Sequence, residues 1–130
     1  MKLIFLCSAF LLFVAAPLSK AETVEEMLSA CRPTAEARVA EGKVFVSDTR
    51  ESGLCWGAFA VIQHLIGLVY PVYNDRPILG VCAPAESTRT QLIAVFVAYA
   101  KNHPERYSEN FTDVALVALR EAFPCKALKK

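Results

Sequence analysis

Cysteine is the residue type of this chain whose number and spacing point most clearly to chemistry. The sequence contains five cysteines, and four of them follow the apolar N-terminal stretch: Cys31, Cys55, Cys82 and Cys125. An even number of cysteines in a short exported chain predicts two disulfide bonds. No Cys-x-x-Cys pair occurs. Since zinc sites usually contain closely spaced ligands, the sequence argues against a metal site, and we expect neither a metal nor a cofactor.

The two histidines, His64 and His103, are the remaining candidates for catalysis or metal binding. They lie far apart in the sequence, His64 within an apolar segment and His103 before Pro104, where a helix should end. Neither has a serine, a free cysteine or paired carboxylates at a spacing that suggests a nucleophile and its base. We therefore predict no catalytic residues and expect that the protein is not an enzyme.

Residues 1–21 have the pattern of a secretory signal peptide. Lys2 supplies the positive charge, an almost uninterrupted apolar run follows, and small residues stand at the two positions that signal peptidase reads, Ser19 and Ala21. An uncleaved membrane anchor is the alternative interpretation. Cleavage after Ala21 would leave residues 22–130 as one exported domain without a membrane span.

The mature chain would be nearly neutral. Removal of Lys2 and Lys20 from the 14 basic residues leaves 12, against 13 acidic residues, which gives a formal net charge of −1. A surface with this balance offers no electrostatic reason to bind nucleic acid or anionic lipid. We therefore expect no nucleic-acid partner.

Helix signals place the cysteines near helix ends. Two capping boxes, Thr23-Val24-Glu25-Glu26 and Thr88-Arg89-Thr90-Gln91, predict helix starts, and Ser52 is a candidate cap for a third helix. The apolar spacing predicts helices over about 24–31, 53–69, 89–102 and 109–123. The fold class that follows is all-α, a small bundle of about four helices stapled by two disulfides.

The positions of the cysteines relative to these helices predict their pairing. In an up-down-up-down bundle, Cys31 meets Cys55 at one end and Cys82 meets Cys125 at the other. Crossed pairs would have to span a helix length of about 20 Å, whereas bonded Cα atoms lie within about 7 Å. We predict the pairs Cys31–Cys55 and Cys82–Cys125. The long connection over 70–87 could invert the second hairpin, and crossed linkages would then replace them.

The segment from Leu54 to Tyr73 is apolar on all sides of a helix apart from Gln63 and His64. Such a helix is usually buried in the middle of a fold. Two alternatives are a helix whose outer face lies in a dimer interface and a transmembrane span. We expect a homodimer, with three residues of one stripe at its interface: Phe59, Ile62 and Ile66.

The stretch from Tyr70 to Pro84 is the longest irregular one and is rich in turn residues. It joins the two halves that the disulfides should hold, and it contains tyrosine and arginine, which often anchor interfaces. We expect its middle to bind a partner protein, with four contact residues: Tyr73, Asn74, Asp75 and Arg76. The exposed face of the last helix, near Arg120 and Glu121, is the second candidate surface.

Several short motifs follow one another along the mature chain in a characteristic order. They are Cys55-x-Gly57, Gly67, Cys82-x-Pro84, Thr88-x-x-Gln91-Leu92, His103-Pro104-Glu105 and Ala122-Phe123-Pro124-Cys125. This series resembles the Rap/Tai family of bacterial immunity proteins. The sequence departs from the family pattern at Trp56, which precedes the usual place of the aromatic residue.

The resemblance implies a periplasmic, helical, disulfide-bonded and often dimeric protein. It also implies a function, which is to bind and block a peptidoglycan amidase effector of a type VI secretion system. A periplasmic stress chaperone or a subunit of an envelope complex would use the same scaffold. Titration of the oligomeric state against pH separates a chaperone from an immunity protein, because acid would open a chaperone of this kind.

Overall fold

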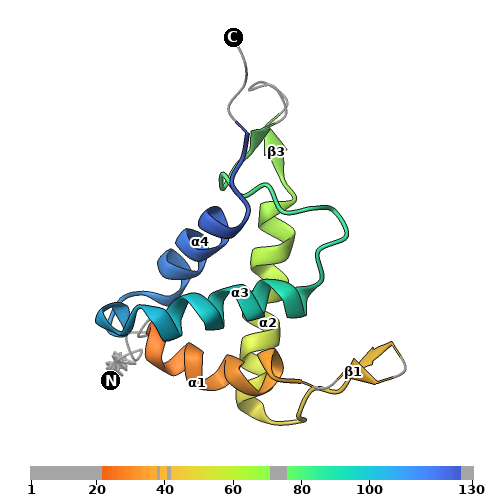
Figure 1. Ribbon diagram of the computed structural model, residues 1–130, viewed down its shortest axis with the longest axis vertical. Helices are drawn as coiled ribbons and strands as arrows, with labels where there is room; N and C mark the ends of the chain where they lie inside the picture. The colour runs from red at the N-terminus through yellow and green to blue at the C-terminus, as the bar shows by residue number, and fades with distance from the viewer. Residues whose placement is uncertain (1–21, 38, 41, 71–75, 127–130) are drawn as a thin grey trace, which may run out of the picture.

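The computed structural model describes residues 22–37, 39–40, 42–70 and 76–126. They form four α-helices with two short β-hairpins between them (Figure 1). The elements in chain order are α1 (Val24–Ala35), β1 (Val39–Ala40), β2 (Lys43–Val44), α2 (Arg50–Ile66), β3 (Val69–Tyr70), β4 (Arg76–Pro77), α3 (Arg89–Asn102), the 3-10 turn η2 (Pro104–Arg106) and α4 (Phe111–Ala122). The prediction of a small all-α bundle is confirmed.

The two predicted capping boxes form. The side chain of Thr23 accepts a hydrogen bond from the backbone of Glu26, whose carboxylate accepts one from the backbone of Thr23 in return. Thr88 and Gln91 make the same reciprocal pair at the start of α3. Each box satisfies backbone donors that would otherwise lack a partner in the first turn. The sequence therefore located the starts of α1 and α3 correctly.

The predicted cap of α2 was wrong. Thr49, not Ser52, caps this helix, and the backbone N–H of Ser52 donates to the hydroxyl of Thr49 at 3.1 Å. Threonine and serine are both suitable caps, so the local sequence did not separate them. The tertiary structure did, because Ser52 is buried three residues before Cys55 and the helix must already have begun there.

Three other helix ends also differ from the predictions. Helix α1 continues through Pro33 to Ala35, and α2 stops at Ile66, where the chain leaves toward β3. Helix α4 begins at Phe111 after Asn110, whose side chain accepts from the backbone of Thr112 at 2.9 Å. These shifts of a few residues arise because contacts between elements, absent from local sequence patterns, decide where a helix ends.

Helix α3 lies at the centre of the molecule and packs against α1, α2 and α4 (Figure 1). The aromatic rings of Phe59, Phe96 and Phe111 join α2, α3 and α4, with ring centroids 5.1 to 5.8 Å apart. The backbone at Thr23 pairs with that at Asn110 and thereby ties the start of α1 to the start of α4. The core is therefore continuous across all four helices.

The expected interface stripe lies in this core instead. Phe59 is completely buried in a single chain, Ile62 is 4 % exposed, and Ile66 packs partly buried against the same core. Buried side chains offer no surface to a second copy, so the choice of these residues as a dimer interface needs correction. The exposed apolar residues of α2 lie on its other side, at Leu54 and Val61.

Gln63 explains how a polar residue fits within the apolar α2. Its side-chain amide donates to the backbone carbonyl of Ser87 at 3.1 Å, and its carbonyl accepts from Nε of Arg89 at 3.2 Å. The guanidinium of Arg89 also lies 4.6 Å from the ring centre of Trp56. These contacts fix the start of α3 on α2.

None of the helices within the described ranges combines the length and apolar character needed to span a bilayer.

Candidate partner-binding surface

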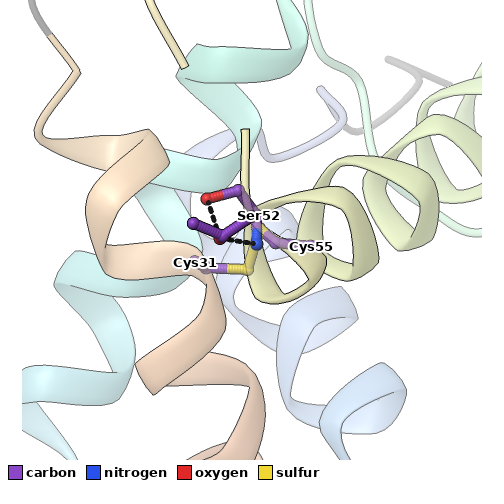
Figure 2. The surroundings of a disulfide bond; sticks show 4 residues. Cys31, Ser52 and Cys55 are labelled. Atoms are coloured by element: carbon purple, nitrogen blue, oxygen red, sulfur yellow. Dashed lines mark hydrogen bonds between the residues drawn. A yellow bond between two sulfur atoms is a disulfide. The ribbon is translucent and has the colours of Figure 1, made fainter. Parts of the chain in front are cut away.

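The two predicted disulfides are confirmed, and they have different surroundings. Cys31 and Cys55 are bonded, with Cα atoms 5.1 Å apart, and both are completely buried between α1 and α2 beside Ser52 (Figure 2). Cys82 and Cys125 are bonded with Cα atoms 5.0 Å apart, and both are exposed. The first disulfide therefore belongs to the core, and the second belongs to the surface.

Strands β3 and β4 form an antiparallel hairpin beyond the end of α2 (Figure 1). Tyr70 pairs with Arg76, and the exposed Val69 pairs with Pro77. Three of the expected contact residues, Tyr73, Asn74 and Asp75, lie outside the described residues. The fourth, Arg76, is exposed on β4. The hairpin thus lies at one end of the molecule, away from α1.

Both arms of the β3–β4 hairpin are attached to the helical body. The first arm continues directly from α2, and the second reaches Val81, whose backbone pairs with Pro124 after α4. The backbone N–H of Cys82 donates to the carbonyl of Phe123 at 2.9 Å, and the exposed disulfide adds a covalent link. Gly80 makes the turn between these contacts with φ +66°, which glycine adopts readily. The scaffold therefore holds both arms of the hairpin.

The second surface expected from the sequence adjoins the base of the hairpin. Arg120 extends from α4 and donates from Nε to the carbonyl of Leu79 at 2.7 Å. Its neighbour Glu121 is exposed. The tertiary structure thus brings the described end of the loop, residues 76–79, beside the end of α4. We call this region the hairpin surface, and define it by Arg76, Leu79, Arg120 and Lys126.

An open cavity of about 910 Å³ lies at the centre of the hairpin surface. It is lined by the second arm of the hairpin, the exposed disulfide, Arg120 and the residues that follow α4. Reasoning from the sequence missed Lys126 as a residue of this surface. The predicted link between Cys82 and Cys125 was a signal for it, because that bond places the next residue beside the loop.

His103 belongs to a polar cluster at the C-terminal end of α3. Its ring stacks on Tyr99, with centroids 4.2 Å apart, and its Nδ1 lies 2.9 Å from a carboxylate oxygen of Glu105. This hydrogen bond lowers the pKa of Glu105. Arg106 donates to both carboxylate oxygens of Glu109 and lowers the pKa of that carboxyl in the same way. The cluster stabilises a helix junction.

The described residues show no arrangement that suggests metal binding. Among them, no group of three or more His, Cys, Asp and Glu side chains is placed to hold a metal ion. His64 is exposed on α2 and lies apart from the cluster around His103. The geometry therefore draws attention to the hairpin surface as the candidate functional site.

Comparison with known proteins identifies a family. The model of a family described as Rap1a immunity proteins matches residues 23–125. No curated protein and no solved structure matches the chain. The matched range includes all four helices, both disulfides and the β3–β4 hairpin. The chain belongs to the family of Rap1a immunity proteins.

Proposed function

We propose that the protein is a periplasmic immunity protein that binds and blocks a peptidoglycan amidase effector of a type VI secretion system. Membership of the immunity family implies immunity to an effector of such a system. The amidase target, the export signal over residues 1–21 and the periplasmic location are further parts of this proposal. They agree with one another, because peptidoglycan and its amidases meet in the periplasm.

The observation that carries the proposal is the hairpin held at both arms. An inhibitor that covers an active site needs no catalytic chemistry of its own, but it gains affinity when its projecting element is already ordered. Helix α2 leads into β3, while the Val81–Pro124 pairing and the exposed disulfide hold the chain after β4. We propose that the segment 71–75, with Tyr73 and Asn74, enters the cleft of the amidase and excludes its substrate.

The test is protection of bacteria against amidases directed to their periplasm. The full chain should prevent lysis by its cognate amidase, and the purified protein should bind that amidase in a stoichiometric complex. Tyr73→Ala combined with Asn74→Ala should weaken binding about thirtyfold if the pair forms a central anchor. Lys43→Ala in the β1–β2 hairpin is the matched control and should bind normally. A folded protein that neither binds nor protects against any secreted amidase would refute the proposal.

We further propose that the protein is a homodimer that uses the outer face of α2. Leu54, Val61 and Leu68 follow one another at intervals of seven residues and are 46 %, 60 % and 39 % exposed. Leu54 and Val61 lie on one side of α2, across from the buried Phe59, because seven residues make about two helical turns, whereas Leu68 follows the end of the helix at Ile66. Exposed apolar side chains of this kind favour contact with another protein surface over water.

A further inference from the structure

The cavity at the hairpin surface is lined by positive charge, although the chain as a whole is nearly neutral. Three of the residues that line it are cations, and they come from three separate segments: Arg76 on β4, Arg120 on α4 and Lys126 after the exposed disulfide. No aspartate or glutamate is among the described residues that line it. The mature chain as a whole is nearly neutral. The positive charge is therefore local to this cavity.

These cations are not neutralised by neighbours within the described part of the chain. The ion pairs found there, Lys101–Glu36, His103–Glu105 and Arg106–Glu109, all lie elsewhere. Nε of Arg120 donates to the carbonyl of Leu79, a neutral acceptor, which fixes the position of the guanidinium without an acidic partner among the described residues. The positive φ of the adjacent Gly80 lets the chain turn beside that guanidinium, 3.6 Å from where a Cβ would stand.

The rest of the lining is apolar. Pro77, Ile78 and Leu79 form one wall and are partly buried, and Pro124 forms part of the opposite wall. A free phosphate would use the cations and leave these walls in water. A protein segment with a carboxylate beside an apolar side chain would use both, since buried apolar area and opposite charge would then be matched together.

We propose that this cavity binds an aspartate or glutamate side chain of the partner protein, next to an apolar residue, while the hairpin occupies the partner's cleft. The inference rests on the proposed function for its partner, but the chemistry that it assigns to the cavity can be tested separately. It makes Arg76, Arg120 and Lys126 determinants of specificity. The expected signature is an affinity and association rate that fall with added salt.

The first experiment needs no effector. The disulfide-bonded chain 22–130, labelled with ¹⁵N, is titrated with a capped peptide that alternates leucine and glutamate, and in parallel with its glutamine counterpart. We expect saturable shifts of the amide signals of Gly80, Cys82 and Cys125 with the glutamate peptide alone. Equal shifts with the glutamine peptide, or stronger binding of inorganic phosphate at the same signals, would overturn the proposal.

Two variants test whether the three cations of the cavity are responsible for peptide binding. Arg76→Gln combined with Lys126→Gln removes two exposed charges, and adding Arg120→Gln also removes the contact to Leu79. We expect roughly tenfold weaker peptide binding in the double variant, since each exposed charge contributes a few-fold, and further loss in the triple variant. Lys43→Gln combined with Arg50→Gln is the matched control, because it removes two exposed cations away from the cavity. Unchanged binding by the double variant would overturn the proposal.

The second experiment uses an amidase that the wild-type chain has been shown to bind. The double variant should associate about tenfold more slowly at low salt and should depend less on salt than wild type. If wild type binds the amidase and the double variant binds equally well, the cavity plays no part and the inference fails alone. If wild type binds no amidase while the glutamate peptide still binds the cavity, the proposed function fails alone.

Discussion

At the scale of single residues, short contacts explain side chains that looked like candidates for chemistry. His103 stacks on Tyr99 and pairs with Glu105, while Arg106 bridges Tyr99 and Glu109. Each of these polar groups has a partner within the junction between α3 and α4. Their spacing in the sequence, His103 to Glu109 across a proline, is that of a structural turn, and these contacts stabilise it.

This cluster predicts a dependence of stability on pH. The pKa values of Glu105 and Glu109 are lowered in the folded protein, by His103 and Arg106 respectively. A lowered folded-state pKa contributes stability above the unfolded pKa and loses it as the pH falls through the folded pKa. We expect the free energy of unfolding of wild type to fall on acidification below the unfolded pKa of glutamate, about 4.3. Glu109→Gln should be less stable near neutral pH and less sensitive to acid.

Urea unfolding at a series of pH values checks this prediction. Glu86→Gln is the matched control, since the exposed Glu86 forms no ion pair among the residues that the structure describes. It should keep the acid sensitivity of wild type. An equal slope against pH in Glu109→Gln and wild type would show that this ion pair does not contribute.

At the scale of elements, the β3–β4 hairpin is joined to α4 by a covalent bond that water can reach. Cys82 and Cys125 are exposed, whereas Cys31 and Cys55 are completely buried between two helices. Thiol–disulfide exchange requires access of a thiolate to a sulfur atom. We therefore expect mild reductant to open the Cys82–Cys125 bond first, with the helical core and the Cys31–Cys55 bond intact.

Alkylation of native protein followed by peptide mass spectrometry measures the order of reduction. Modification of Cys82 and Cys125 should precede that of Cys31 and Cys55. The same sample should keep its helical circular dichroism, because neither Cys82 nor Cys125 belongs to the core cluster. Simultaneous reduction of both bonds under native conditions would contradict the difference in access.

Gly80 is a second determinant of how the hairpin joins the body. Its φ of +66° is costly for residues with a Cβ, so Gly80→Ala should lower the free energy of unfolding by about 1–2 kcal/mol. Gly53→Ala in α2 is the matched control, since nothing lies within 4 Å of the added Cβ and alanine favours helix. It should raise stability by up to about 1 kcal/mol. Chemical denaturation of both variants measures their free energies of unfolding, which should change in opposite directions. An equal change in the two variants would refute this explanation.

At the scale of the whole molecule, the central question is whether two copies associate through the outer face of α2. Val61→Asp would place a charge at the centre of that face, and an unpaired charge in an interface is strongly unfavourable. We expect wild type to be dimeric and Val61→Asp to be monomeric by light scattering at the same concentration. Val61 is 60 % exposed in the single chain, so the variant should still fold.

Phe45 provides the control for this prediction. It is 64 % exposed and lies between β2 and α2, outside the helix. Phe45→Asp should therefore remain dimeric. A wild-type chain that stays monomeric at high micromolar concentration would refute the dimer, whereas dissociation by Phe45→Asp alone would move the interface to the other hairpin.

The sequence by itself determined the starts of two helices and the covalent links. Two capping boxes located α1 and α3, since a cap depends on residues three apart. The positions of the four cysteines relative to the helices predicted the observed pairs, because in an up-down-up-down bundle a helix length separates the wrong partners. The fold class and family also followed from these short-range patterns.

Only the tertiary structure decided which faces are buried and which surfaces meet. The apolar α2 offered two sides to the core, and packing against Phe96 and Phe111 selected the side with Phe59. Arg76, Arg120 and Lys126 are brought to one cavity by contacts between segments far apart in the chain. Such contacts depend on long-range geometry, and no local spacing in the sequence encodes them.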